Sequence, residues 1–136
     1  MKKGPYAMFQ TDPKVEASEG IVLDYGSFRI RVARAGGANA AFKRLMSDKL
    51  RPYRKQLDLG TIDEDLAQKI LVEVYSESVI LGWEGVTDEK GKALPFTRVN
   101  VTKLLTDLPD LFRDIQEQAA SLSNFKAEQL EEEAKN

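Results

Sequence analysis

The first regular pattern in the chain is an alternation of apolar and polar residues between positions 21 and 33. The run that starts at Ile21 is rich in β-branched and aromatic residues, Gly26 and Ser27 interrupt it, and the alternation resumes afterwards. Strict alternation places successive side chains on opposite faces of a strand, so we predict a β-hairpin. Its predicted apolar face holds Phe28, Ile30 and Val32, and its other face holds Arg29 and Arg31.

From Ala38 the apolar residues recur with the spacing of a helix, and proline and glycine divide the pattern into segments. A first helix is expected up to Pro52, because proline lacks a backbone donor and ends or kinks a helix. The sequence Thr61-Ile62-Asp63-Glu64 has the form of a capping box. It predicts a second helix that starts there, carries the densest apolar stripe and ends at Gly82.

Further helices are expected in the C-terminal half. Thr97 can cap one, and Pro109 can occupy the first turn of the next, where proline is tolerated. The preceding residues 82–96 contain glycines and a polar tip, which predicts a tight loop or a small hairpin. A final helix is expected from Asn124, with an end that frays through the acidic residues 131–133.

These elements together predict an α+β fold that is mainly α-helical. An N-terminal β-hairpin is followed by four to five helices, with the small Gly-Trp loop or hairpin between them. The polar residues 1–19 are expected to form a flexible N-terminal arm. Residues 20–136 then form a single mainly helical domain, and the hydrophobic content of 42% is enough for a core. No apolar run is long enough to cross a bilayer and no signal peptide is recognisable, so a cytoplasmic location is expected.

Cysteine and histidine are both absent from the sequence. The lack of cysteine excludes disulfides, thiolate nucleophiles and cysteine-ligated metals. The lack of histidine removes the side chain most used for proton transfer near neutral pH, and the commonest metal ligand. Because no motif indicates carboxylate, lysine or tyrosine chemistry, we expect a protein that is not an enzyme and that uses no metal and no cofactor.

The two halves of the chain carry opposite charge, although the net charge is only −2. Residues 1–57 contain twelve Lys and Arg against five Asp and Glu, and residues 58–136 contain eight against seventeen. Two solvated faces are the ordinary explanation. The alternative is an electrostatic dipole that favours head-to-tail self-association into rings or spirals. A nucleic-acid-binding face is disfavoured, because the whole protein is acidic and Phe28 and Tyr53 are expected to pack in the core.

Three motifs in the second half of the chain carry a family resemblance. They are Gly82-Trp83-Glu84-Gly85-Val86, then Asp88-Glu89-Lys90-Gly91 with Leu94-Pro95-Phe96, then Leu104-Leu105-Thr106-Asp107-Leu108-Pro109-Asp110-Leu111-Phe112. With the helical patterns on either side, this region resembles the tail assembly chaperones that are encoded in the tail gene clusters of long-tailed bacteriophages. The resemblance covers about half of the chain.

The resemblance implies a mainly helical protein of the host cytoplasm that forms a homo-oligomeric spiral or ring. Such chaperones bind the tape-measure protein, keep it soluble during viral tail assembly, and are absent from the mature virion. The family commonly makes a longer form by ribosomal frameshifting, and that form recruits the tail-tube protein. The final residues Ala134-Lys135-Asn136 can be encoded by a slippery heptamer, so we expect this chain to be the short, unshifted product.

A chaperone of this kind has no catalytic residues, so the candidate site is a partner-binding surface. We expect it to include Trp83, Phe96, Leu105, Leu108 and Phe112. Ordinary core packing is the alternative for each of them. Two other functions remain open: a structural head–tail or tail component that is retained in the virion, and a small nucleic-acid-binding regulator.

Overall fold

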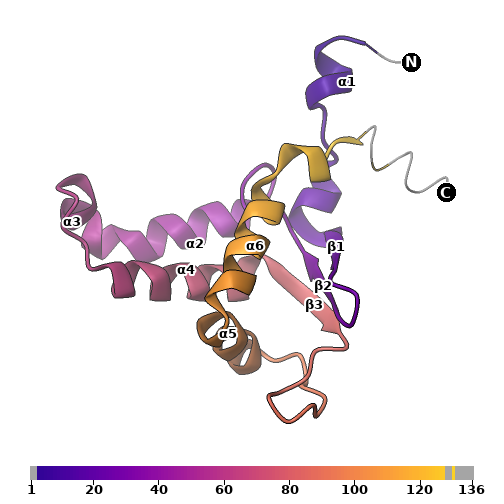
Figure 1. The fold of residues 1–136 in the computed structure, drawn as a ribbon. Helices are drawn as coiled ribbons and strands as arrows, with labels where there is room; N and C mark the ends of the chain where they lie inside the picture. The colour runs from indigo at the N-terminus through magenta and orange to yellow at the C-terminus, as the bar shows by residue number, and fades with distance from the viewer. Residues whose placement is uncertain (1–2, 128–129, 131–136) are drawn as a thin grey trace.

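Helices pack against one face of a small β-sheet in the computed structural model of the protein, which describes residues 3–127 and residue 130 (Figure 1). In chain order the elements are α1 (Pro5–Phe9), β1 (Ile21–Asp24), β2 (Arg29–Val32), α2 (Ala40–Leu50), α3 (Arg54–Asp58), α4 (Glu64–Ser78), β3 (Ile80–Glu84), α5 (Arg98–Asp107) and α6 (Pro109–Ala120). A π-helical turn (Val15–Glu19) and two 3₁₀ turns (Arg51–Tyr53 and Leu122–Asn124) complete them. The fold is α+β and mainly α-helical, as predicted.

The predicted hairpin forms two strands of a three-stranded antiparallel sheet with the order β1-β2-β3. The amide of Tyr25 donates to the carbonyl of Phe28 at 3.0 Å and closes the turn between β1 and β2. Ile30 and Val32 are buried and the arginines between them are exposed, as the alternation predicted.

The third strand corrects the sequence prediction that the second helix ends at Gly82. α4 ends at Ser78, and β3 follows it and pairs antiparallel with β2. Gly82 lies opposite Arg31 in this pairing, and a bulge follows that position. A short apolar run is compatible with a helix and with a buried strand, and here the pairing with β2 makes it a strand. The Gly-Trp pair therefore lies in a strand.

Helix caps follow the sequence closely, with one exception. Thr97 accepts a hydrogen bond from the amide of Asn100 at 3.1 Å and caps α5, and Pro109 is the first residue of α6, both as predicted. At α4 the N-cap is Asp63, whose carboxylate accepts from the amide of Leu66 at 3.1 Å. The capping box expected to begin at Thr61 is therefore wrong; aspartate two positions later serves at least as well as a cap.

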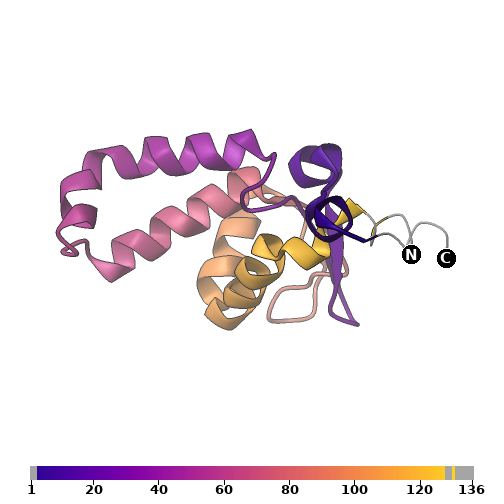
Figure 2. The same cartoon turned by 90° about the horizontal axis from the view of Figure 1, so that it is seen from above.

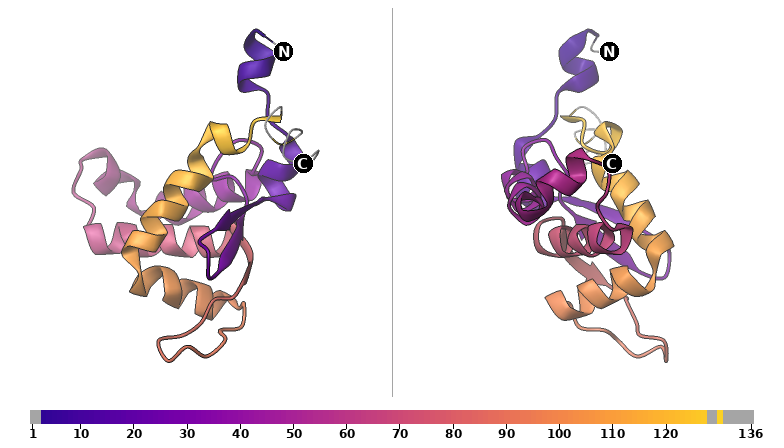
Figure 3. Two further views of the ribbon diagram at one scale, coloured as in Figure 1. Left: turned by 45° about the vertical axis from the view of Figure 1, so that its right-hand side comes forward. Right: turned by 90° about the vertical axis from the view of Figure 1, so that its left-hand side faces the viewer.

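The core lies between the inner face of the sheet and α4, α5 and α6. Its largest fully buried side chains are Phe112, Phe125, Ile30, Leu105 and Ile115. Tyr75 of α4 connects the layers, because its ring meets Phe42 of α2 and Phe112 of α6 edge-on, at centroid distances of 5.6 and 5.2 Å. The left view in Figure 3 shows α6 crossing in front of α4.

α2, α3 and α4 form a helical hairpin that extends away from the sheet (Figures 1 and 2). None of the eleven residues of α2 is buried, so its apolar side is only half covered by α4. Pro52 lies in the 3₁₀ turn between α2 and α3, which confirms the predicted break. Leu59, at the far end of this hairpin, is 67% exposed.

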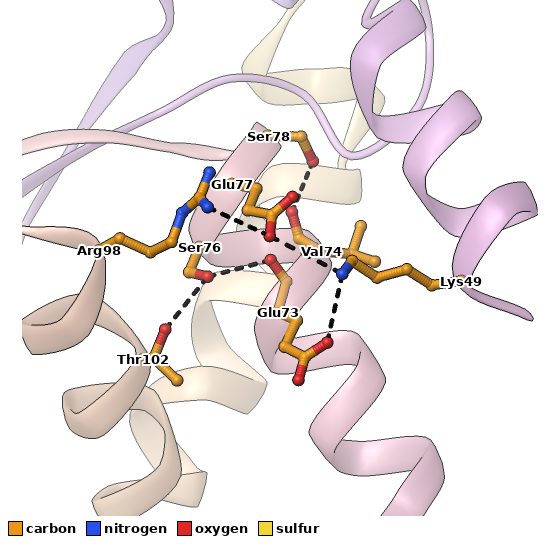
Figure 4. A network of polar contacts seen from close by, with 8 residues as sticks. All are labelled: Lys49, Glu73, Val74, Ser76, Glu77, Ser78, Arg98 and Thr102. Carbon is orange, nitrogen blue, oxygen red and sulfur yellow. Dashed lines mark hydrogen bonds and ion pairs between the residues drawn. The ribbon is translucent and has the colours of Figure 1, made fainter.

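A polar network on α4 holds α2 and α5 in place (Figure 4). The carboxylate of Glu77 lies 3.8 Å from the ammonium of Lys49 in α2 and 3.5 Å from the guanidinium of Arg98 in α5. Lys49 also pairs with Glu73 at 3.3 Å, and the hydroxyl of Thr102 donates to that of Ser76 at 3.3 Å. The basic α2 is thus attached to the acidic side of α4.

The predicted N-terminal arm has two parts in the structure. Glu16 is only 2% exposed and pairs with Arg34 at 2.6 Å, so the second part is docked on the domain. The first part, α1, stands clear of the body, and none of its five residues is buried (Figures 1 and 3). The acidic end predicted at 131–133 lies outside the described residues.

Candidate partner-binding groove

The connection between β3 and α5 is an ordered loop, which fits the predicted loop or small hairpin. Thr87 and Ala93 form an isolated bridge, and the amide of Leu94 donates to the carbonyl of Val86 at 2.9 Å. At the tip, the carboxylate of Asp88 accepts hydrogen bonds from the amides of Lys90 and Lys92, each at 2.9 Å. The side chains of this loop therefore project from a fixed backbone.

Two aromatic residues fasten the loop to the sheet. The indole nitrogen of Trp83 donates to the carbonyl of Leu94 at 3.0 Å, and the indole meets the ring of Phe96 edge-on at 5.2 Å. Trp83 is half-buried, whereas Phe96 is 43% exposed. Phe96 thus presents apolar surface to solvent while Trp83 supports it from behind.

A groove of about 480 Å³ lies between this loop and α5, and we call it the loop groove. Leu94, Leu104 and Leu108 supply its apolar lining. Leu108 is 47% exposed, so the apolar surface is open to solvent. Charged side chains line it as well: Asp88, Glu89, Lys90, Lys103 and Asp107.

The charges of the loop groove include an ion pair between Lys103 and Asp107. The hydrogen bond and the negative charge of Asp107 raise the pKa of Lys103, so the ammonium stays charged at any physiological pH. Proteins use hydrophobic grooves to bind the apolar face of an amphipathic helix. No cluster of side chains able to hold a metal occurs among the described residues.

The five residues predicted to bind a partner fall into two groups. Leu108 lines the loop groove, whereas Trp83 and Phe96 contact each other at the base of its loop. Leu105 is 2% exposed and Phe112 is not exposed, so in this fold both belong to the core and not to a binding surface. The helical period is the physical reason, because it turns neighbouring residues of one helix to different sides.

Sequence reasoning missed two residues that line the groove, Leu94 and Leu104. Leu104 and Leu108 are four positions apart and therefore lie on the same side of a helical path, whereas Leu105 points to the side of Val101. That spacing is visible in the sequence and separates the groove residues from the core residues. Leu94 carries no such signal, because only the fold of the loop turns it toward α5.

The fold and the groove together define a small α+β domain with an open, partly apolar groove. The chain belongs to the YdaY prophage protein family, whose sequence model matches residues 37–136. It is therefore a phage-derived protein, as the family resemblance implied at this coarser level. Searches of curated proteins and of solved structures gave no match. Within the described residues, no helix is long and apolar enough to span a membrane.

Proposed function

We propose that this prophage protein is a tail assembly chaperone that binds the tape-measure protein and keeps it soluble until the tail tube forms. The observation that supports the proposal most directly is the loop groove, where Leu108 exposes apolar surface beside charged residues. A long, mostly helical partner presents apolar stripes that need cover before assembly. A groove of this kind covers one or two turns of such a helix.

The size of the groove also suits a partner that must later be released. At about 480 Å³ it accepts only a few apolar side chains, so a single site binds weakly. Many copies along one tape measure give a strong total interaction without a strong single contact. Tail-tube subunits can then displace the copies one at a time.

The proposal is tested by co-expressing the chain with the tape-measure protein of the same prophage and measuring how much tape measure stays soluble and bound. The variant Leu108→Ser removes the most exposed apolar side chain of the groove lining and leaves the buried core residues unchanged. We expect it to bind at least about tenfold more weakly, which corresponds to about 1.4 kcal/mol. Unchanged capture by this variant would contradict the proposal.

A matched control is Val99→Ser, because Val99 is 76% exposed on α5 and does not line the groove. This variant loses a similar apolar side chain and is expected to bind like the wild type. Mass spectrometry of purified particles provides a second test. A chaperone is missing from the virion, and a stoichiometric amount of the chain in particles would favour a structural tail component.

A further inference from the structure

β1 lies at the edge of the sheet, where it pairs with β2 alone among the described strands (Figure 1). The amide of Tyr25 donates to the carbonyl of Phe28, so Tyr25 directs its backbone groups toward β2. In an antiparallel pair every second residue does so, and Leu23 therefore faces β2 in the same way. Val22 and Asp24 alternate with these residues and direct their amides and carbonyls away from β2.

These outward backbone groups have no partner in the part of the chain that the structure describes. No turn, loop or side chain there hydrogen-bonds to the amide or carbonyl of Val22 or of Asp24. The other edge strand, β3, is different, because Leu81 is an extra residue in its pairing with β2 and such bulges protect edges from further pairing. β1 pairs with β2 without a bulge, so its free edge is regular and can accept another strand.

A groove of about 600 Å³ follows this free edge, and we call it the edge groove. Its lining includes every residue from Gly20 to Tyr25 in turn, so it runs along the strand and not over one face of the sheet. Asp114 and Gln118 of α6 line its opposite side, and the hydroxyl of Tyr25 donates to Asp114 at 2.6 Å. Proteins bind extended peptides by adding them to a free strand edge, where main-chain hydrogen bonds give affinity and neighbouring side chains give specificity.

We propose that the edge groove binds an extended segment of a partner protein, which pairs with β1 as a fourth strand of the sheet. The outward amides and carbonyls of Val22 and Asp24 form the hydrogen bonds to the main chain of this segment. A helical segment cannot replace it, because the amides of a helix are already paired within the helix. This contact does not involve the loop groove, and it goes beyond the proposed function.

The side chains on the two faces of the edge define which segment fits. On the side of the helices lies Asp114, whose carboxylate forms no ion pair among the described residues, whereas Asp24 is already paired with Arg29 at 3.5 Å. On the opposite face lie Val22, which is 45% exposed, and the positive charge of Arg31. Successive residues of a strand point to opposite faces. We therefore expect a basic residue that faces Asp114 to alternate with an apolar residue beside Val22, where Arg31 disfavours a second basic residue.

Selection of short random peptides on the full chain tests the contact. The selected peptides are then measured on Val22→Pro, which loses the outward amide but keeps the bonds to β2, since proline is tolerated where its missing N–H would face solvent. We expect binding to this variant to be at least about tenfold weaker. Val22→Thr is the matched control, because it keeps the amide in a β-branched residue, and it should bind much more tightly than Val22→Pro. Equal binding to Val22→Pro and the wild type, or the absence of any selected peptide, would overturn the proposal.

Methylation of single peptide amides gives a readout on the wild type itself, so it does not depend on the folding of a variant. A strand paired with β1 directs every second amide toward it, so methylation should abolish binding at alternate positions and be tolerated between them. In hydrogen exchange, the peptide should slow the amides of Val22 and Asp24 at least about tenfold, while the amide of Leu23, which faces β2, changes little. Sensitivity without this alternation, or protection confined to other strands, rejects the contact.

Two further variants separate the charge of the edge groove and the loop groove from the main-chain contact. Asp114→Asn keeps an oxygen that accepts from Tyr25, and it should bind the basic peptides at least about threefold more weakly. Equal binding would overturn the placement of the basic residue. Leu108→Ser should bind the selected peptides like the wild type, so failure of this contact and failure of the proposed function are distinguishable. Sedimentation velocity detects the alternative occupant, β1 of a second copy; a dimer that is lost in Val22→Pro would overturn the assignment to a partner protein.

Discussion

At the scale of single residues, Glu16 and Arg34 form the most deeply buried ion pair in the described part of the chain. The Glu16 side chain is 3% exposed and that of Arg34 18% exposed, and the hydroxyl of Thr11 donates to the second carboxylate oxygen at 2.8 Å. The guanidinium of Arg34 also lies 5.8 Å from the centre of the Phe125 ring. No sequence pattern connects these residues, since Glu16 and Arg34 are 18 positions apart and Phe125 is far beyond both.

We predict that Glu16→Ala lowers the free energy of unfolding by about 3–5 kcal/mol, because it leaves Arg34 buried without its partner. Chemical denaturation measures the loss. The control is Glu19→Ala, since Glu19 is exposed and its side chain makes no ion pair among those described; its effect should stay within about 0.5 kcal/mol. In a double-mutant cycle, Arg34→Ala should cost much less in the Glu16→Ala background. Additive losses would contradict the coupling.

Tyr25 provides a prediction about pH. Burial and then the hydrogen bond to Asp114, at 2.6 Å, raise the pKa of the Tyr25 hydroxyl far above its usual value of 10.0. The folded state therefore keeps this proton at a pH where the unfolded chain loses it. This contribution to stability is complete below pH 10 and is lost as the pH rises beyond it.

The corresponding measurement is the free energy of unfolding between pH 8 and about pH 11, for the wild type and Tyr25→Phe. Phenylalanine has no proton to lose, so we expect a smaller decline above pH 10 in the variant. Burial also raises the pKa of Tyr75, so part of the decline remains. Parallel curves for the two proteins would show that the pKa of Tyr25 is not raised in the folded state.

At the scale of elements, the sequence predicted those parts whose signals are local. The hairpin follows from alternation around Gly26, and α5 and α6 follow from Thr97 and Pro109. β3 was missed because its apolar run continues the stripe of α4 without a break, and only pairing with β2 makes it a strand. The sequence predicted only part of the loop groove, because only some of its residues follow a local pattern. The position of Leu108 follows from the helical spacing, whereas that of Leu94 depends on the fold of the loop.

Two glycines test the assignment of β3, because Gly82 lies within the strand and Gly85 follows its last residue. Gly82 has an ordinary strand conformation and open space where a Cβ would lie, so Gly82→Val should leave stability unchanged or raise it by up to about 1 kcal/mol. Gly85 has a φ of +74°, and a Cβ there would lie 2.7 Å from the carbonyl oxygen of Ser27. Gly85→Val should therefore cost about 1–3 kcal/mol. If thermal denaturation ranked the two variants in the opposite order, the assignment of β3 would be wrong.

At the scale of the whole molecule, the two oppositely charged halves of the sequence pack against each other. Lys49 of the basic half is attached to Glu73 and Glu77 of the acidic half, and Arg29 of β2 lies 3.9 Å from Glu84 of β3. Two basic residues of the first half, Lys49 and Arg29, are thus paired with carboxylates of the second half.

The unequal burial of the helices and strands determines which part of the molecule unfolds first. α2 contributes no buried side chain, and it is held to α4 by half-covered apolar residues and by the ion pairs of Lys49. α6 and β2, in contrast, carry fully buried residues of the core. Regions with little buried apolar surface open with a lower free energy than the core. In hydrogen exchange, we therefore expect the amides of α2 and α3 to exchange well before those of β2 and α6.

Glu77→Gln tests this expectation at a single side chain, because the carboxylate of Glu77 is shared by Lys49 and Arg98. Half-buried ion pairs of this kind contribute about 1 kcal/mol, so exchange in α2 and α3 should become about fivefold faster while the core is unaffected. Glu64→Gln, in the exposed first turn of α4, is the control and should change neither region. Equal acceleration throughout the protein would mean that the hairpin unfolds only with the core. Acceleration confined to α2 and α3 would mean that these two helices open as a separate unit, which the ion pairs with α4 hold closed.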